Sequence, residues 1–384
     1  MTENRLVKQS DFPASQKMTY LNAASVALMY SQAAEAAIDW QKDLAENGTL
    51  NFDEEAEVRI FEDLRFAAAK LIEAKSSDIA VGSSATELLS SLAWATLPTK
   101  EEVIVGTEAS FPSTIYPWQR VSRYVGCEVR LAKADKLGFI DEGELLDLID
   151  ERTAIVTVSH VEYKTGQVYD LEAISKKAHY HGGLLIVDAT QSAGQIPINV
   201  QKMNADAIVA SGYKWLCGPF GSAFLYLAPG LQNRLDPGIV GWRSHKDIWD
   251  LRADRLEYPN SAKRFEPSTM AYGSVIGLSK AIDFLTSIGI EKIYSHNLSL
   301  VDVLVTELKS RGGSILLKDA VSRHSSILSV DFPTEDSEGI VRLLNNENVI
   351  VSFREHVRIS PHIYNNENDI GKLIEVFDKV ARRR

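Results

Sequence analysis

Lys214 is the residue whose surroundings most clearly indicate chemistry. It follows a buried-strand pattern, in a segment of glycines and small residues that runs from Val209 to Gly221. Lysine is seldom fully buried unless it is paired or has reacted. A Schiff base with an aldehyde cofactor is one way to hold it there. The alternative is a lysine whose ammonium reaches from the strand end to solvent. This segment alone leaves both interpretations open.

Two other motifs carry groups that such a cofactor needs. Asp188 ends the apolar run that starts at Leu184, and a carboxylate at the carboxyl end of a buried strand suits a protonated pyridine nitrogen. Gln191, one turn further on, could donate to a ring hydroxyl. The small residues from Val81 to Glu87 lead from a strand into a helix, whose N-terminus binds anions. Turn and cap residues explain each motif singly, but the combination favours a cofactor site.

The elements that position these groups alternate along the chain. Apolar, β-branched runs predict seven strands, at 79–82, 102–106, 127–131, 154–160, 183–188, 206–210 and 222–227. Amphipathic patterns between them predict helices at 87–96, 112–124, 143–149 and 171–181. This alternation predicts an α/β fold with a mostly parallel, seven-stranded sheet. We expect a large domain over residues 20–269 and a smaller α+β domain that comprises residues 270–384 together with residues 1–19.

Composition excludes several classes of protein. The 384 residues carry 41 Lys and Arg against 52 Asp and Glu, a net charge of −11, which argues against nucleic-acid binding. No apolar stretch is long enough to span a membrane, and the first ten residues lack a signal-peptide core. Two cysteines cannot form a disulfide framework, and the histidines show no metal-binding spacing. Dinucleotide, P-loop and serine-hydrolase motifs are missing. We expect a soluble, cytoplasmic enzyme or binding protein that binds neither membrane nor metal.

The motifs resemble those of the fold-type I, class V aminotransferase superfamily, which uses pyridoxal 5′-phosphate (PLP). The resemblance extends from Tyr20 to Asn365 and is closest to cysteine desulfurases, isopenicillin N epimerase-like proteins and kynureninases. It implies that Lys214 forms the Schiff base, Asp188 partners the pyridine nitrogen and Gln191 donates to O3′. The positions that match the phosphate site are Ala85, Thr86, Ser211 and Tyr213. Phe111 matches the residue that stacks on the cofactor ring, and Tyr163 stands where desulfurases often carry Asn. Arg358 matches the arginine that binds the substrate carboxylate, and Asn22, Ala24 and Trp242 match the substrate pocket. Thr269 matches a threonine that reaches the partner subunit's phosphate, which implies a homodimer with a shared active site.

The departures from this pattern bear on the reaction. Desulfurases carry a nucleophilic cysteine on a loop before the carboxylate-binding arginine, but residues 349–358 contain none, and Cys217 is better explained as a small buried hydrophobe. We therefore expect a C–S lyase that eliminates the β-substituent of an amino acid without a catalytic cysteine. An aminotransferase or an epimerase of a small amino acid is the alternative, followed by a kynureninase-type hydrolase. A PLP-binding protein that serves a partner, or a binding domain without PLP, would be the non-enzymatic alternatives.

Overall fold

The computed structural model describes residues 5–316, 324–332 and 336–382, and side chains up to residue 379. Seven strands form the central sheet, in the order β2-β8-β7-β6-β5-β3-β4, and only β8 runs antiparallel to its neighbours. They are β2 (Ile79–Gly82), β3 (Val103–Thr107), β4 (Glu128–Ala132), β5 (Thr153–Ser159), β6 (Leu184–Asp188), β7 (Ala207–Ser211) and β8 (Ala223–Leu227). Each lies within one residue of its predicted start and end. The predicted α/β class is confirmed.

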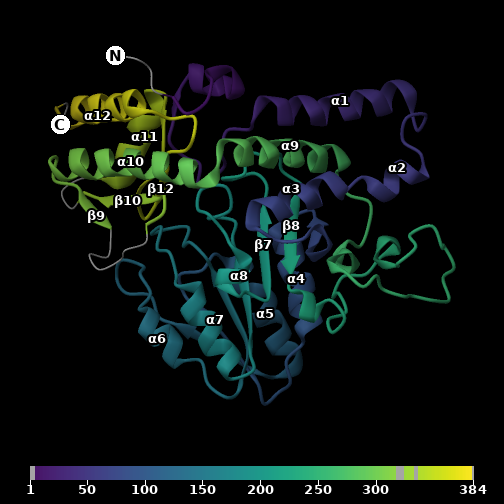
Figure 1. Ribbon diagram of the computed structural model, residues 1–384. Helices are drawn as coiled ribbons and strands as arrows, with labels where there is room; N and C mark the ends of the chain where they lie inside the picture. The colour runs from purple at the N-terminus through teal and green to yellow at the C-terminus, as the bar shows by residue number, and fades with distance from the viewer. Residues whose placement is uncertain (1–4, 317–323, 333–335, 383–384) are drawn as a thin grey trace.

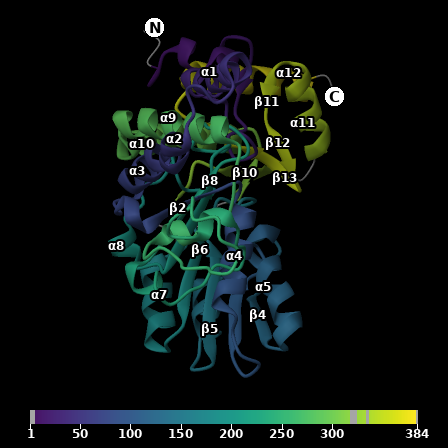
Figure 2. The same ribbon diagram turned by 90° about the vertical axis from the view of Figure 1, so that its right-hand side faces the viewer.

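Helices cover both faces of this sheet (Figures 1 and 2). Side chains of α4 (Ala85–Thr96) and α5 (Pro112–Val125) pack on one face, where Ile186 of β6 points. The other face, where Leu185 and Val187 point, packs against α3 (Glu62–Ile72), α6 (Glu142–Asp147), α7 (Leu171–Tyr180) and α9 (Tyr272–Ile288). Short helices α2 (Glu54–Arg59) and α8 (Val200–Met203) lie at the periphery, and α1 (Ser31–Asn47) packs along α9. Burial on both faces explains why these strands are continuously apolar.

The C-terminal part forms a second, smaller unit. Its antiparallel sheet has the order β12-β13-β10-β9 and comprises β9 (Ser314–Leu316), β10 (Leu328–Asp331), β12 (Ser352–Arg354) and β13 (His356–Ile359). Helices α10 (Ile290–Lys309), α11 (Ser337–Asn346) and α12 (Glu367–Arg382) pack on it, and β1 (Thr19–Tyr20) pairs with β11 (Val349–Ile350). Pairing of β1 with β11 ties the start of the chain to this unit, and both chain ends lie near it (Figure 1).

Helix α9 belongs with the large unit in its packing. Leu278, Ile282 and Leu285 lie in the same hydrophobic cluster as the central sheet, whereas the cluster of the small unit includes Leu300 and Leu304 of α10. This packing shows that α9 contributes to the core of the large unit, and the boundary we expect from sequence at residue 270 stays a prediction.

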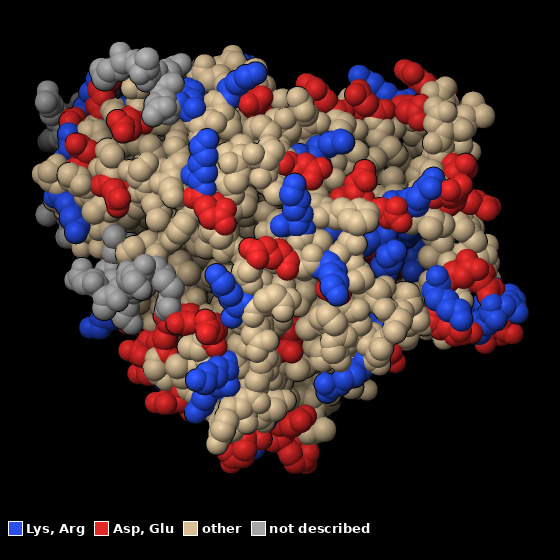
Figure 3. Space-filling model, viewed as in Figure 1, with Lys and Arg blue, Asp and Glu red and all other residues tan. Residues whose placement is uncertain are grey.

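The long helices are not separate membrane spans. No single helix in the described ranges is long and apolar enough to cross a bilayer; α9 and α10 would satisfy length and composition only as a pair, and they are bent by 78° at Gly289. On the face in Figure 3, acidic and basic side chains are intermixed over the surface.

Candidate active site

The site lies where three neighbouring parallel strands end. Asp188 ends β6, and its backbone pairs with Ser159 at the end of β5 and with Val209 of β7, two residues before Ser211. The carboxyl ends of parallel strands meet at one edge of the sheet, where open α/β sheets bind their ligands. Nine of the residues we expected to serve the cofactor or the reaction line one pocket here: Ala85, Thr86, Phe111, Tyr163, Asp188, Gln191, Ser211, Tyr213 and Lys214, with Asp188 and Lys214 each expected in both roles. Sequence alone could not establish this convergence.

Lys214 is buried in this pocket beside aromatic rings. Its side chain is 8% exposed, and Nζ lies 5.4 Å from the centroid of Phe111 and 5.9 Å from that of Tyr213. Burial lowers the pKa of Lys214 to about 8, Asp188 opposes this shift, and the positive charges of Arg358 and Arg354 add to it. Burial therefore favours the neutral, nucleophilic amine.

The carboxylate of Asp188 is fixed through both oxygens. The backbone N–H of Thr190 donates to Oδ1 at 2.9 Å, and the hydroxyl of Thr114 donates to Oδ2 at 3.0 Å. Thr114 lies in the first turn of α5, and its own carbonyl accepts a bond from Thr157 of β5 at 3.1 Å. The carboxylate is thus held between the sheet and the helix, and each oxygen can accept a further bond.

Gln191 belongs to a hydrogen-bond network that joins the two units. Its Nε2 donates to the carbonyl of Ala24 at 3.0 Å, and its Oε1 accepts from Trp215 Nε1 at 2.8 Å. The carbonyl of Trp215 in turn accepts from His362 Nε2 at 2.9 Å, and burial lowers the pKa of His362 to about 3, so that ring is neutral. Gly194 allows this close approach, because its φ is +98° and a Cβ there would lie 2.3 Å from the carbonyl oxygen of Trp215. One N–H of Gln191 remains to donate elsewhere.

The opposite end of the pocket is built to accept an anion. The first turn of α4 brings Ala85 and Thr86 to the pocket, and Ser84 caps this helix by accepting from the N–H of Glu87 at 3.2 Å. Ser211 Oγ accepts from the N–H of Ala85 at 3.0 Å, and the Thr86 hydroxyl donates to Ser113 Oγ at 2.8 Å. N–H groups in a first helical turn have no intrahelical acceptor, and the helix dipole favours negative charge there.

Phe111 presents a flat surface over the site from the start of α5. Its ring meets Tyr163 edge to face, with centroids 5.4 Å apart. The loop before it is anchored by the fully buried Glu162, whose Oε1 accepts from Ser110 Oγ at 3.2 Å and from Tyr169 at 3.0 Å. Burial raises the pKa of Glu162 to about 7. Sequence reasoning missed this carboxylate, since nothing in its spacing distinguishes it from a surface glutamate.

Arg358 reaches the site from the small unit. It is 1% exposed, with Nη1 donating to the carbonyl of Tyr163 at 2.6 Å, Nη2 to Ser25 Oγ at 2.6 Å and Nε to Ser352 Oγ at 3.1 Å. Burial and the nearby Arg354 lower its pKa, yet a guanidinium remains charged at neutral pH. Each terminal nitrogen has a second N–H that these bonds do not use, and the two unused N–H groups can together bind a carboxylate.

The segment from Asn22 to Ser25 closes this side of the site. Asn22 bridges to Ser360 beyond β13, and the N–H of Ala24 donates to Ser360 Oγ at 3.0 Å. The amide oxygen of Asn22 is buried without a hydrogen-bond partner among the described residues. The segment therefore bonds to Gln191 through the carbonyl of Ala24 and to Arg358 through Ser25 Oγ, and the substrate-pocket roles of Asn22 and Ala24 stay predictions.

Five of the expected site residues do not line this pocket: Asn22, Ala24 and Arg358, described above, and Thr269 and Trp242. Thr269 is exposed, at the end of a segment anchored by the buried ion pair of Glu266 with Arg65 at 2.8 Å. Trp242 instead meets Trp249, with ring centroids 5.7 Å apart. Their assigned roles stay predictions.

Neither cysteine is placed to react at the site. Cys217 is fully buried, and burial raises the pKa of its thiol far above the ordinary value. Cys127 is buried just before β4, and burial raises its pKa too. The hairpin of β12 and β13 turns at Glu355 alone, with a φ of +64°, so it has no loop at that turn for a nucleophile.

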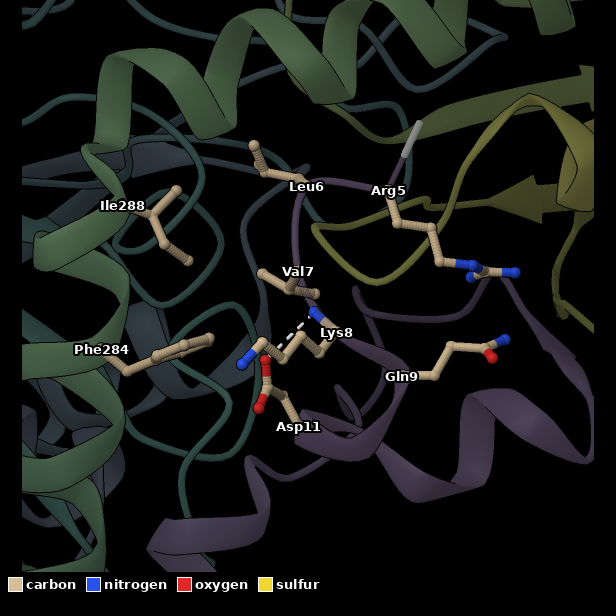
Figure 4. A pocket seen from close by; sticks show the side chains of 8 residues that line it. All are labelled: Arg5, Leu6, Val7, Lys8, Gln9, Asp11, Phe284 and Ile288. Atoms are coloured by element: carbon tan, nitrogen blue, oxygen red, sulfur yellow. Dashed lines mark hydrogen bonds between the residues drawn. The ribbon is translucent and has the colours of Figure 1, made fainter. Parts of the chain in front are cut away.

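A second hollow, of about 500 Å³, lies far from these groups in the fold. It is lined by Arg5–Gln9 and Asp11 from the start of the chain and by Phe284 and Ile288 of α9 (Figure 4). The figure shows the apolar side chains of Leu6 and Val7 on the side facing α9. The backbone N–H of Lys8 donates to Asp11 Oδ2 at 3.1 Å. It shares no lining residue with the pocket around Lys214.

The donor set of the pocket matches PLP group by group. A buried amine of lowered pKa suits the aldehyde, and a fixed carboxylate suits the pyridine nitrogen. The remaining N–H of Gln191 suits the ring hydroxyl, Phe111 suits the ring face, and the first turn of α4 suits the phosphate. The residues present therefore fit this cofactor.

Comparison with known proteins agrees with this fit to PLP. The family model described as aminotransferase class-V matches residues 19–373. A "probable cysteine desulfurase" from Methanothermobacter thermautotrophicus is 28% identical, covering 97% of this chain and 96% of the relative. The "uncharacterized aminotransferase YcbU" of Bacillus subtilis is 29% identical, covering 95% of each.

Solved structures share the fold. The apo cysteine desulfurase of Thermococcus onnurineus NA1 has a TM-score of 0.87 at 22% identity and covers 98% of both chains. The cystine C–S lyase C-DES, in complex with its product cysteine persulfide, has a TM-score of 0.86 at 24% identity and covers 96% of this chain and 99% of that one. The predicted family and fold are thereby confirmed. The chain belongs to the aminotransferase class-V family and is a PLP-dependent enzyme of fold type I.

Proposed function

We propose that this enzyme is a C–S lyase that removes a sulfur-linked β-substituent from an amino acid without a catalytic cysteine. The observation that carries the proposal is the composition of the site: Lys214 and Asp188 line one pocket and Arg358 donates to the carbonyl of Tyr163 in its lining, whereas Cys217 is enclosed in the core. Two relatives of similar fold, a cysteine desulfurase and a cystine C–S lyase, support the reaction class.

The chain's own residues can supply each step of an elimination. Bound PLP supplies an electron sink for the pair released at Cα. Arg358 binds the α-carboxylate through its two terminal nitrogens and so orients the Cα–H bond. Lys214 Nζ, neutral above a pKa of about 8, accepts the proton from Cα and can return it to the departing sulfur. Asp188, held by Thr114 and Thr190, keeps a proton on the pyridine nitrogen.

The decisive experiment supplies the purified holoenzyme with L-cysteine, L-cystine and an S-alkyl-L-cysteine. Elimination followed by hydrolysis consumes water and yields pyruvate, ammonia and the released sulfur species in equal amounts, so we expect these three products to rise together. The sulfur species is sulfide from L-cysteine, a persulfide from L-cystine and a thiol from the S-alkyl-L-cysteine. Formation of the pyridoxamine form with a new keto acid, and no pyruvate, would contradict the proposal and make the enzyme an aminotransferase. The Bacillus subtilis relative's name favours that second candidate. Inversion at Cα, or cleavage between Cβ and Cγ, would indicate an epimerase or a kynureninase-type hydrolase.

The proposal includes a homodimer. Thr269 is exposed and does not line the pocket of its own chain, as we expect of a residue that serves a partner's phosphate. Phe220, 59% exposed, stacks on Tyr213 beside the pocket and offers an apolar surface for a second copy. Sedimentation should give twice the chain mass, and Thr269→Ala should weaken PLP binding without changing that mass. A monomer with full activity would contradict this arrangement.

A further inference from the structure

Arg354 is a charged group at the site that the reaction leaves unused. It ends β12, and in the hairpin Arg354 pairs with His356 while Ser352 pairs with Arg358. Because cross-strand pairs and alternate residues share a face, Ser352, Arg354, His356 and Arg358 all lie on one face of the hairpin. Ser352 Oγ accepts from Arg358 Nε on that face, and Val357, on the other face, is buried in the core of the small unit.

This face looks into the active site. Arg358 extends from it to Tyr163 and Ser25. The charge of Arg354 acts on both Arg358 and the buried Lys214, lowering the pKa of each. Arg354 itself is exposed, so its guanidinium lies at the surface, on the same face of the hairpin as Arg358.

No acidic side chain in the described ranges pairs with Arg354. Its described hydrogen bond is from Nη1 to the adjacent carbonyl of Phe353, at 2.6 Å. The neighbouring Glu355 is engaged instead by Lys164, and the nearby Asp331 lies 3.6 Å from His356 Nδ1. A guanidinium facing a substrate pocket without a protein carboxylate is complementary to an anion brought by the ligand.

The charges of the site leave one position for such an anion. Arg358 is needed for the α-carboxylate and Asp188 for the cofactor nitrogen, while the first turn of α4, at the other end, would hold the cofactor's phosphate. We propose that Arg354 is a specificity-determining residue that binds an acidic group at the far end of the substrate side chain. The preferred substrates are then amino acids whose β-substituent carries a carboxylate or a similar acid.

This inference rests on the proposed function, because it names the substrate class of the same site. Its test therefore measures binding as well as turnover. Holoenzyme is titrated with L-glutamate against L-glutamine, a pair that differs in charge and hardly in shape, and affinity is read from the change in the cofactor's visible spectrum. The same pairing is repeated for turnover with S-carboxymethyl-L-cysteine against S-carbamoylmethyl-L-cysteine.

We expect wild-type enzyme to favour the acid of each pair by roughly fivefold to tenfold, with a preference that shrinks as salt is raised. Arg354→Gln should remove the preference and leave affinity for the amides within twofold, and Arg354→Lys should retain part of it. Arg342→Gln, at an exposed arginine of α11, is the matched control and should behave as wild type.

Equal affinity of wild-type enzyme for acid and amide, or an undiminished preference in Arg354→Gln, would overturn the inference. Both outcomes are visible in the binding titration even when no elimination occurs. An acid preference that depends on Arg354 in an enzyme releasing no pyruvate would uphold the inference and refute the proposed reaction instead.

Discussion

The two regions that meet at the active site hold their polar groups differently. At the edge of the central sheet, both oxygens of Asp188 are bonded and Lys214 is enclosed beneath aromatic rings. On the hairpin of the small unit, Arg358 is fixed by three bonds, while Arg354, four residues earlier, is exposed and pairs with no carboxylate among the described residues. The sheet edge thus supplies chemistry that any substrate needs, whereas the hairpin supplies the contacts that distinguish one substrate from another. Variants on the two sides should therefore fail in different ways.

The largest effect should come from Lys214→Ala. Without the amine, PLP has no attachment point and the Cα proton has no base, so we expect loss of the visible absorbance of the bound cofactor and at least a thousandfold fall in turnover, the upper part of the range for a catalytic base. Spectra and steady-state assays measure both. Lys202→Ala, at an exposed lysine of α8, should leave both unchanged. Persistence of the absorbance in Lys214→Ala would remove the basis of the assignment.

Asp188→Ala should rank second. Removing the carboxylate leaves the pyridine nitrogen without its partner, and we expect turnover to fall about a hundredfold or more, with weaker PLP binding. Thr114→Val provides a graded comparison, because it removes only the hydroxyl that holds Oδ2 and should cost a few-fold at most. Equal losses in the two variants would mean that Asp188 acts only as a structural acceptor.

Arg358→Ala should change binding more than chemistry. Loss of a charge-assisted, two-pronged contact with the substrate carboxylate should raise KM by roughly tenfold to a hundredfold and change kcat far less. Arg358 also bonds three protein groups, so thermal unfolding must be measured in parallel. A lower unfolding temperature with an unaltered KM would assign it a structural role alone.

The lowered pKa of Lys214 predicts a smaller, pH-dependent effect. Only the neutral amine reacts with PLP, and a pKa of about 8 means that its neutral fraction rises roughly tenfold from pH 7 to pH 9 and then levels off. The rate at which apoenzyme binds PLP, followed by absorbance, should rise and saturate over the same interval. A rate that still climbs steeply above pH 10 would indicate an ordinary, solvated lysine.

These comparisons also explain what could be predicted from sequence. Strands β6 and β7 were predictable because burial on both faces requires continuous apolar runs, and a polar residue at the end of such a run is conspicuous. The bond from Thr114 to Asp188 was not predictable, because a threonine in a first helical turn gives no sign of the strand that it faces. The position of Arg354 was not predictable either, since the face of the hairpin on which it lies depends on the register of β12 with β13. The boundary between the units is hard to predict for a related reason: the apolar face of α9 does not reveal which sheet it covers.

Cys217→Ser should have the smallest effect on activity. The thiol is fully enclosed, and the residue serves as backbone, since its N–H donates to the carbonyl of Lys214 at 2.8 Å and its carbonyl accepts from Tyr30 at 3.0 Å. Serine keeps these bonds but buries a hydroxyl among apolar groups, so the free energy of unfolding should fall by about 1–3 kcal/mol. Cys127→Ser is the matched control, and both variants should retain turnover within twofold. A folded Cys217→Ser enzyme that kept the cofactor's absorbance but released no sulfur would bring back a persulfide mechanism. In that case the sheet edge, and not the hairpin, would hold the sulfur nucleophile.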